Sequence, residues 1–149
     1  NGNEIYGFNV TGNFGLRAKD WLDNRSEGLS PNNLLECSGL TSVSLFRAYG
    51  VDGVGCSGNW TERANPALFR EVTDAEIRPG DFLTKSFGCN SDASNSSGGH
   101  VAIAASAPDA NGNIIVYETD SWEKPVRFTK KNLSDFPGGH SRYIGTGTQ

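Results

Sequence analysis

Apolar and polar residues recur with a helical period in the first third of the chain. The pattern over residues 14–25 predicts a short amphipathic helix. A second helix is predicted to begin at Asn33, which has capping-box spacing to Glu36, and to end at Tyr49, where Gly50 can supply a C-terminal cap. The residues expected on the buried side of this second helix are Leu40, Val43 or Ser44, Phe46 or the stem of Arg47, and Tyr49.

The pattern changes after the second helix. Residues 51–80 are predicted to be irregular, with one helical turn around 67–72. The Arg-Pro-Gly-Asp run at 78–81 predicts a tight turn, and the Asp-Ala-Asn-Gly run at 109–112 predicts a hairpin. Five strands are predicted, over residues 81–87, 100–107, 113–119, 126–129 and 142–144. Helices followed by strands predict an α+β fold with a five-stranded antiparallel sheet.

Length and charge limit the classes of protein to which this chain can belong. The 149 residues fit one domain spanning 1–149, and 36% hydrophobic residues suffice for a single core. The net charge of −4 is scattered along the chain, which argues against a nucleic-acid partner because such proteins usually carry a basic patch. No apolar run approaches the ~20 residues of a membrane span, so no membrane partner is expected.

The three cysteines differ in their surroundings. Cys56 and Cys89 lie in runs of small loop residues, whereas Cys37 opens the apolar segment of the second helix. We therefore predict a Cys56–Cys89 disulfide and a free thiol at Cys37. A disulfide implies an oxidising compartment, hence a secreted, periplasmic or extracellular protein. The alternative is three reduced, buried thiols in a cytosolic protein. No Cys-x-x-Cys or Cys/His cluster is present, so no metal is expected.

Cys37 has the position expected of a nucleophile. A helix N-terminus stabilises a thiolate, and an adjacent imidazole can take the thiol proton. Ser38 and Gly39 are small enough to admit a substrate close to the backbone, and the Cys37 N–H could donate to an oxyanion. His100 is the candidate base, because Gly99 before it leaves space around the ring for substrate.

Glu118 is the candidate third member of the site. His100 shares one face of its predicted strand with Ala102 and Ala104, whose small side chains would let the helix approach the sheet there. Glu118 ends an otherwise apolar face of the neighbouring strand, where it needs a partner such as the far nitrogen of His100. Asp120, two residues further on, is the rival for this position.

Each of these residues also has a structural interpretation. Cys37 could be a buried helix cysteine, His100 a surface residue at a strand end, and Glu118 a solvated strand end. His140 is predicted to lie in a loop. Spacing alone leaves the catalytic and structural interpretations about equally supported.

Three short motifs, taken in their order along the chain, resemble those of a known family. They start at Glu36 (Glu-Cys-Ser-Gly-Leu-Thr-Ser), Arg78 (Arg-Pro-Gly-Asp-Phe-Leu) and Gly99 (Gly-His-Val-Ala-Ile). Together they resemble the NlpC/P60 family of cysteine peptidases, and residues 99–118 look similar to the related CHAP amidases. The resemblance implies a papain-like α+β fold, cleavage of amide bonds in bacterial peptidoglycan stem peptides, and a Glu at position 118 that orients the catalytic His.

The chain also departs from the family pattern. The Tyr/Trp-Gly-Gly segment that usually precedes the nucleophile is absent from residues 29–35, and Glu36 stands where Asp is usual. Substrate preference therefore does not carry over.

The resulting hypothesis is a secreted, monomeric cysteine amidase or endopeptidase that acts on peptidoglycan and needs no cofactor. Housekeeping wall remodelling, a defensive lysin and an antibacterial toxin would share this site, and an immunity or inhibitor protein could fill the cleft. Two alternatives remain: an acyltransferase or transpeptidase with the same Cys-His pair, and a catalytically silent wall-binding module.

Overall fold

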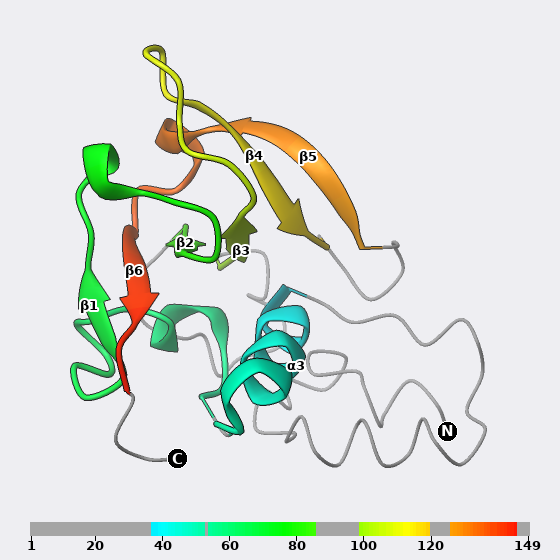
Figure 1. Ribbon diagram of the computed structural model, residues 1–149, viewed down its shortest axis with the longest axis vertical. Helices are drawn as coiled ribbons and strands as arrows, with labels where there is room; N and C mark the ends of the chain where they lie inside the picture. Colours follow the sequence, from blue (N-terminus) through cyan, green and yellow to red (C-terminus); the bar gives the residue numbers. More distant parts are fainter. Residues whose placement is uncertain (1–36, 53, 86–98, 120–125, 146–149) are drawn as a thin grey trace.

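The computed structural model describes residues 37–52, 54–85, 99–119 and 126–145. One α-helix and a six-stranded antiparallel sheet of order β1-β6-β2-β3-β4-β5 dominate this part of the chain (Figure 1). The elements are α3 (Cys37–Tyr49), β1 (Phe69–Glu71), β2 (Phe82–Thr84), β3 (Val101–Ala104), β4 (Asn113–Glu118), β5 (Arg127–Asn132) and β6 (Gly139–Tyr143), with short 3-10 helices η1 (Ser57–Asn59), η2 (Asp74–Glu76) and η4 (Leu133–Asp135).

The predicted α+β class is confirmed for the described residues, but the prediction of five strands is wrong. The additional strand is β1, in a segment for which a helical turn was predicted. Phe69 and Glu71 pair with Tyr143 and Ser141 of β6, so β1 forms one edge of the sheet. A three-residue edge strand is too short to show an alternating pattern, and only its pairing with β6 defines it.

The helix α3 ends as predicted. Gly50 adopts a left-handed conformation with φ of +74°, and its N–H donates to the carbonyl of Phe46 at 2.8 Å. The predicted buried side is only partly correct. Leu40 and Val43 are buried, but Leu45 is also buried, and Tyr49 is 51% exposed. The predicted helix over 14–25 lies outside the described residues.

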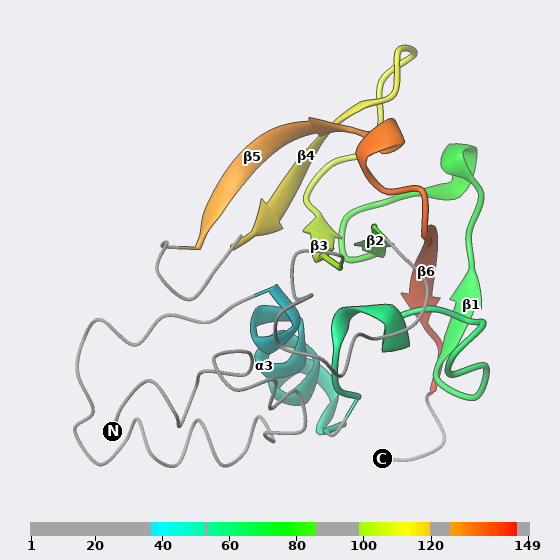
Figure 2. The ribbon, with the colours of Figure 1, turned by 180° about the vertical axis from the view of Figure 1, so that it is seen from behind.

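Helix α3 covers one face of the sheet (Figures 1 and 2). The apolar cluster on this face joins Cys37 and Leu45 of α3 to Phe82 and Val101 of the sheet. A second cluster on the opposite face contains Leu83, Ala102, Ala104, Ile114, Val116 and Phe136. The central strands are therefore buried on both faces, as sheets covered on two sides require.

Candidate active site

Cys37 is the first residue of α3 as the structure describes it. Its thiol is free and buried beside Val101 and Phe82. Ser38 and Gly39, predicted to contact substrate, are also buried in this turn. Gly99 is half-buried immediately before His100. The substrate contacts of Ser38, Gly39 and Gly99 stay predictions.

His100 and Glu118 are in direct contact. The Nε2 atom of His100 lies 2.8 Å from Oε1 of Glu118, and the Glu118 side chain is completely buried. The pairing of β3 with β4 explains this contact. Ile103 lies opposite Tyr117, so the next position of β4, Glu118, falls opposite Ala102, and His100 is its diagonal neighbour two residues along the same face. Asp120, the predicted alternative to Glu118, lies outside the described residues.

The Cys37 side chain interacts with the His100 ring closely enough to raise the pKa of the imidazole. Because Glu118 holds Nε2, Nδ1 is the ring nitrogen that can face the sulfur. The structure thus brings the three predicted catalytic side chains together, with the imidazole of His100 hydrogen-bonded to Glu118 and interacting with Cys37. Their catalytic roles stay a prediction.

The surroundings of His100 strongly change its protonation. Burial alone would lower the pKa of His100, since it disfavours the charged ring. The hydrogen bonds to Cys37 and Glu118, with the negative charges of both groups, outweigh burial and raise the pKa to about 9. At neutral pH the ring is therefore an imidazolium, which favours the nucleophilic thiolate form of a neighbouring cysteine.

Phe136 fixes the ring of His100 from the side. The two rings are stacked, with centroids 6.3 Å apart and planes 21° from parallel. Phe136 is itself buried in the apolar cluster on the face opposite α3. A packed ring of this kind limits the orientations open to the imidazole, so it helps to hold His100 against Glu118.

Lys131 is a fourth charged group at the site, and it was not predicted. Its Nζ lies 3.6 Å from Oε2 of Glu118, and its side chain is 30% exposed. The buried carboxylate therefore lies between two cationic groups, His100 and Lys131. The strand was predicted to end at Thr129, since the Lys-Lys-Asn that follows has no apolar alternation, but the observed β5 continues to Asn132.

The expected approach of the helix over Ala102 and Ala104 is wrong. Both alanines point away from α3 and belong to the opposite cluster with Phe136. Helix α3 instead faces Val101 and Ile103, the alternate residues of β3. His100 still reaches Cys37 because it lies just before β3, at the end of the strand.

The remaining cysteine and histidine predictions have different outcomes. Cys56 is disulfide-bonded. Its predicted partner, Cys89, lies outside the described residues, so the pairing stays a prediction. The prediction that His140 lies in a loop is wrong. His140 belongs to strand β6, where its Nε2 lies 3.1 Å from Oδ1 of Asp74.

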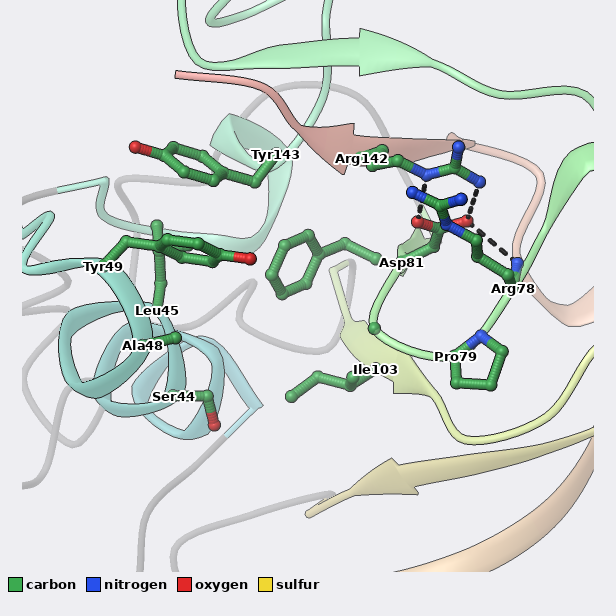
Figure 3. A pocket seen from close by; sticks show the side chains of 12 residues that line it. Ser44, Leu45, Ala48, Tyr49, Arg78, Pro79, Asp81, Ile103, Arg142 and Tyr143 are labelled. Atoms are coloured by element: carbon green, nitrogen blue, oxygen red, sulfur yellow. Dashed lines mark hydrogen bonds and ion pairs between the residues drawn. The ribbon is translucent and has the colours of Figure 1, made fainter. Parts of the chain in front are cut away.

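The Arg-Pro-Gly-Asp motif at 78–81 has a structural role, because it joins two strands of the sheet. The buried Asp81 carboxylate accepts hydrogen bonds from Nε and Nη2 of Arg142, at 2.8 and 2.9 Å. It also accepts one from the backbone N–H of Arg78, at 3.0 Å (Figure 3). These bonds join the start of β2 to β6. The adjoining cavity, of about 310 Å³, lies beside the C-terminal half of α3, where Tyr49 faces Tyr143, and includes none of the three predicted catalytic residues.

Two further findings concern the described part of the chain. Within it, no group of three or more His, Cys, Asp or Glu side chains could hold a metal ion. None of the helices described there is long and apolar enough to cross a membrane.

Comparison with known proteins gives a distant likeness. No family model matches the chain, and no curated protein matches it. A solved structure of N-acetylmuramoyl-L-alanine amidase from Staphylococcus aureus is similar, with a TM-score of 0.48 and 18% sequence identity. The likeness covers 73% of this chain and 30% of the amidase chain, so this chain spans less than a third of that protein.

Proposed function

We propose that this protein is a cysteine hydrolase that cleaves amide bonds in peptidoglycan stem peptides. The observation that carries the proposal is the 2.8 Å contact between the buried Glu118 carboxylate and Nε2 of His100, beside the free thiol of Cys37, whose interaction with the ring raises the pKa of His100. Nucleophile, base and orienting group in hydrogen-bond reach of one another are the recurrent arrangement of thiol hydrolases. The peptidoglycan substrate rests on the resemblance of the motifs around Cys37, Asp81 and His100.

The mechanism follows from these contacts. The Cys37 thiolate attacks the carbonyl carbon of the scissile amide, and the carbonyl oxygen takes up the negative charge. The charged His100 then gives its proton to the leaving amine as the C–N bond breaks. A water molecule next attacks the thioester, with neutral His100 as its base, and releases the acid and the thiolate. Glu118 keeps the ring oriented and balances its charge throughout.

The helix supplies the group that would stabilise the oxyanion. Backbone N–H groups in the first turn of a helix have no partner within it, and the helix dipole places partial positive charge there. We propose the N–H of Cys37, at the start of the described part of α3, as the donor to the carbonyl oxygen in the transition state.

A secreted location belongs to the same proposal. The disulfide at Cys56 supports it, because such bonds persist in oxidising compartments. We propose Cys89 as its partner. The chain would act outside the cytosol, where cell-wall peptides are accessible, and an inhibitor or immunity protein could cover the site.

The test uses purified protein and peptidoglycan sacculi, with released fragments identified by mass spectrometry. Wild-type protein should release stem-peptide fragments, and the Cys37→Ala and His100→Gln variants should release none. His140→Gln is the matched control, since His140 is the other histidine of the chain and contacts Asp74 instead of the site. Equal release by wild type and Cys37→Ala would overturn the proposal.

A further inference from the structure

A second cavity adjoins the candidate active site. It measures about 400 Å³ and lies between the end of β2 and η4, and His100 forms part of its wall. The backbone places Lys85 beside His100, because the N–H of Lys85 donates to the carbonyl of His100 at 2.8 Å. Lys131 lines the same cavity from β5. The cavity and the candidate catalytic centre thus share His100.

The charges that line this cavity are mainly positive. Lys85, Lys131 and the protonated His100 contribute three cationic groups, against one acidic lining residue, Asp135. Asp135 is engaged in its own turn, where Oδ2 accepts the N–H of Asn132 at 3.0 Å. Since the whole chain has a net charge of −4, a cationic cavity differs from its average surface.

Lys131 is partly neutralised by Glu118, but Lys85 is not placed against that carboxylate. Lys131 lies 3.6 Å from Glu118, which also holds His100. Lys85 extends from the end of β2 and is exposed. An anion in the cavity would therefore meet the ammonium of Lys85 together with the outer side of Lys131. Phe136 and Pro137 add apolar walls, which limit water and strengthen such an interaction.

We propose that this cavity binds a free carboxylate of the substrate, adjacent to the amide that Cys37 attacks. The inference rests on the proposed function, because it assigns the chemical class of the group that the same site recognises. Lys ammonium groups bind carboxylates as point charges. A peptide with an acidic side chain or a terminal carboxylate near the scissile bond is the substrate class that fits, and amidation of that carboxylate weakens its recognition.

The experiment compares two alkylating reagents of nearly equal size. Iodoacetate carries a carboxylate and iodoacetamide its neutral amide, and each transfers its carbon to the Cys37 sulfur with loss of iodide. The measured quantity is the ratio of the two second-order rate constants for wild type, Lys85→Gln and Lys131→Gln. Loss of one nearby cation should lower the iodoacetate-to-iodoacetamide ratio about fivefold in Lys85→Gln.

Lys130→Gln is the matched control. Lys130 is the adjacent residue of β5 but lines a different cavity, next to Ser106 and Ile115. The same loss of charge there should leave the wild-type ratio unchanged. An unchanged ratio in Lys85→Gln, or an equal fall in Lys85→Gln and Lys130→Gln, would overturn the inference. In the first case the cavity has no effect on anions, and in the second the effect is that of net charge alone.

This readout is independent of amide hydrolysis. If sacculi remain intact while the ratio falls selectively in Lys85→Gln, the peptidoglycan proposal fails and the carboxylate site stands. If sacculi are cleaved but the ratio is the same in wild type and Lys85→Gln, the carboxylate site fails alone. A pair of peptides that differ only by a carboxylate or its amide gives the second measurement, with the preference expected as a lower KM for the carboxylate.

Discussion

The carboxylate of Glu118 lies 2.8 Å from Nε2 of His100, although the Glu118 side chain has no exposed surface. A buried carboxylate is costly unless cationic or donor groups surround it. Here His100 and Lys131 share it, one at each oxygen. The contact makes protonation of the ring and burial of the acid mutually dependent, and the first predictions follow from this dependence.

Glu118→Gln should keep the shape of the side chain and remove its charge. The imidazolium would lose one of the two groups that raise its pKa, so the pKa of His100 should fall below about 9. We expect hydrolysis to fall by roughly 10²-fold or more, as for other positioned acid–base groups. NMR titration of the His100 ring and steady-state kinetics would measure both effects; an unshifted titration would show that Glu118 has no influence on the base.

Stability should depend on pH through His100. The pKa of His100 rises from its ordinary value of 6.5 to about 9 on folding, so the charged ring stabilises the folded state fully below pH 6.5. This contribution is lost as the pH rises through about 9. Thermal unfolding at pH 6 and pH 9.5 should show a larger loss of Tm for wild type than for His100→Gln. Equal losses in the two proteins would contradict the prediction.

Cys37 should be more reactive than an ordinary thiol. His100 lies beside it and is charged at pH 6, so iodoacetamide should modify Cys37 at that pH much faster than it modifies a free cysteine. His100→Gln should remove this advantage, whereas His140→Gln should keep it. Mass spectrometry of the alkylated protein over time gives the rates. Slow modification of wild-type Cys37 would favour a catalytically silent binding module.

Arg142→Met should destabilise the fold without touching the site. The variant leaves the buried Asp81 carboxylate without its bidentate partner, and removal of one member of such a pair costs about 3–5 kcal/mol. Arg70→Met is the control, because Arg70 makes an exposed contact with Glu76 at 3.8 Å, which should be worth about 0–1 kcal/mol. Urea unfolding of both variants would compare the two free energies, and equal costs would refute the structural role of the Asp81–Arg142 pair.

The helix that carries Cys37 and the His100–Glu118 contact could be predicted because their signals are local. A glycine cap defines the end of α3, and the Asp-Ala-Asn-Gly turn sets β3 beside β4, which brings position 100 towards position 118. Lys131 was missed because its relation to Glu118 depends on how far β5 extends, and polar residues at the end of an edge strand carry no apolar alternation.

The side of the sheet on which α3 lies could not be predicted. Val101 and Ala102 are neighbours on β3, and both are buried, on opposite faces. A strand covered on both faces is an uninterrupted apolar run, so alternation does not tell which face meets the helix. Strand β1 was missed for a related reason, because three residues hold too little pattern to separate a strand from a turn.

The sheet divides the interior, and the site spans the division. Cys37 belongs to the apolar cluster on the helix side, whereas His100 stacks on Phe136 of the cluster on the other side. Cys37 therefore meets His100 only after both halves of the core have assembled. In a partly folded chain the thiol would lack this neighbour, so under the proposed mechanism the same architecture that builds the site also delays its activity until folding is complete.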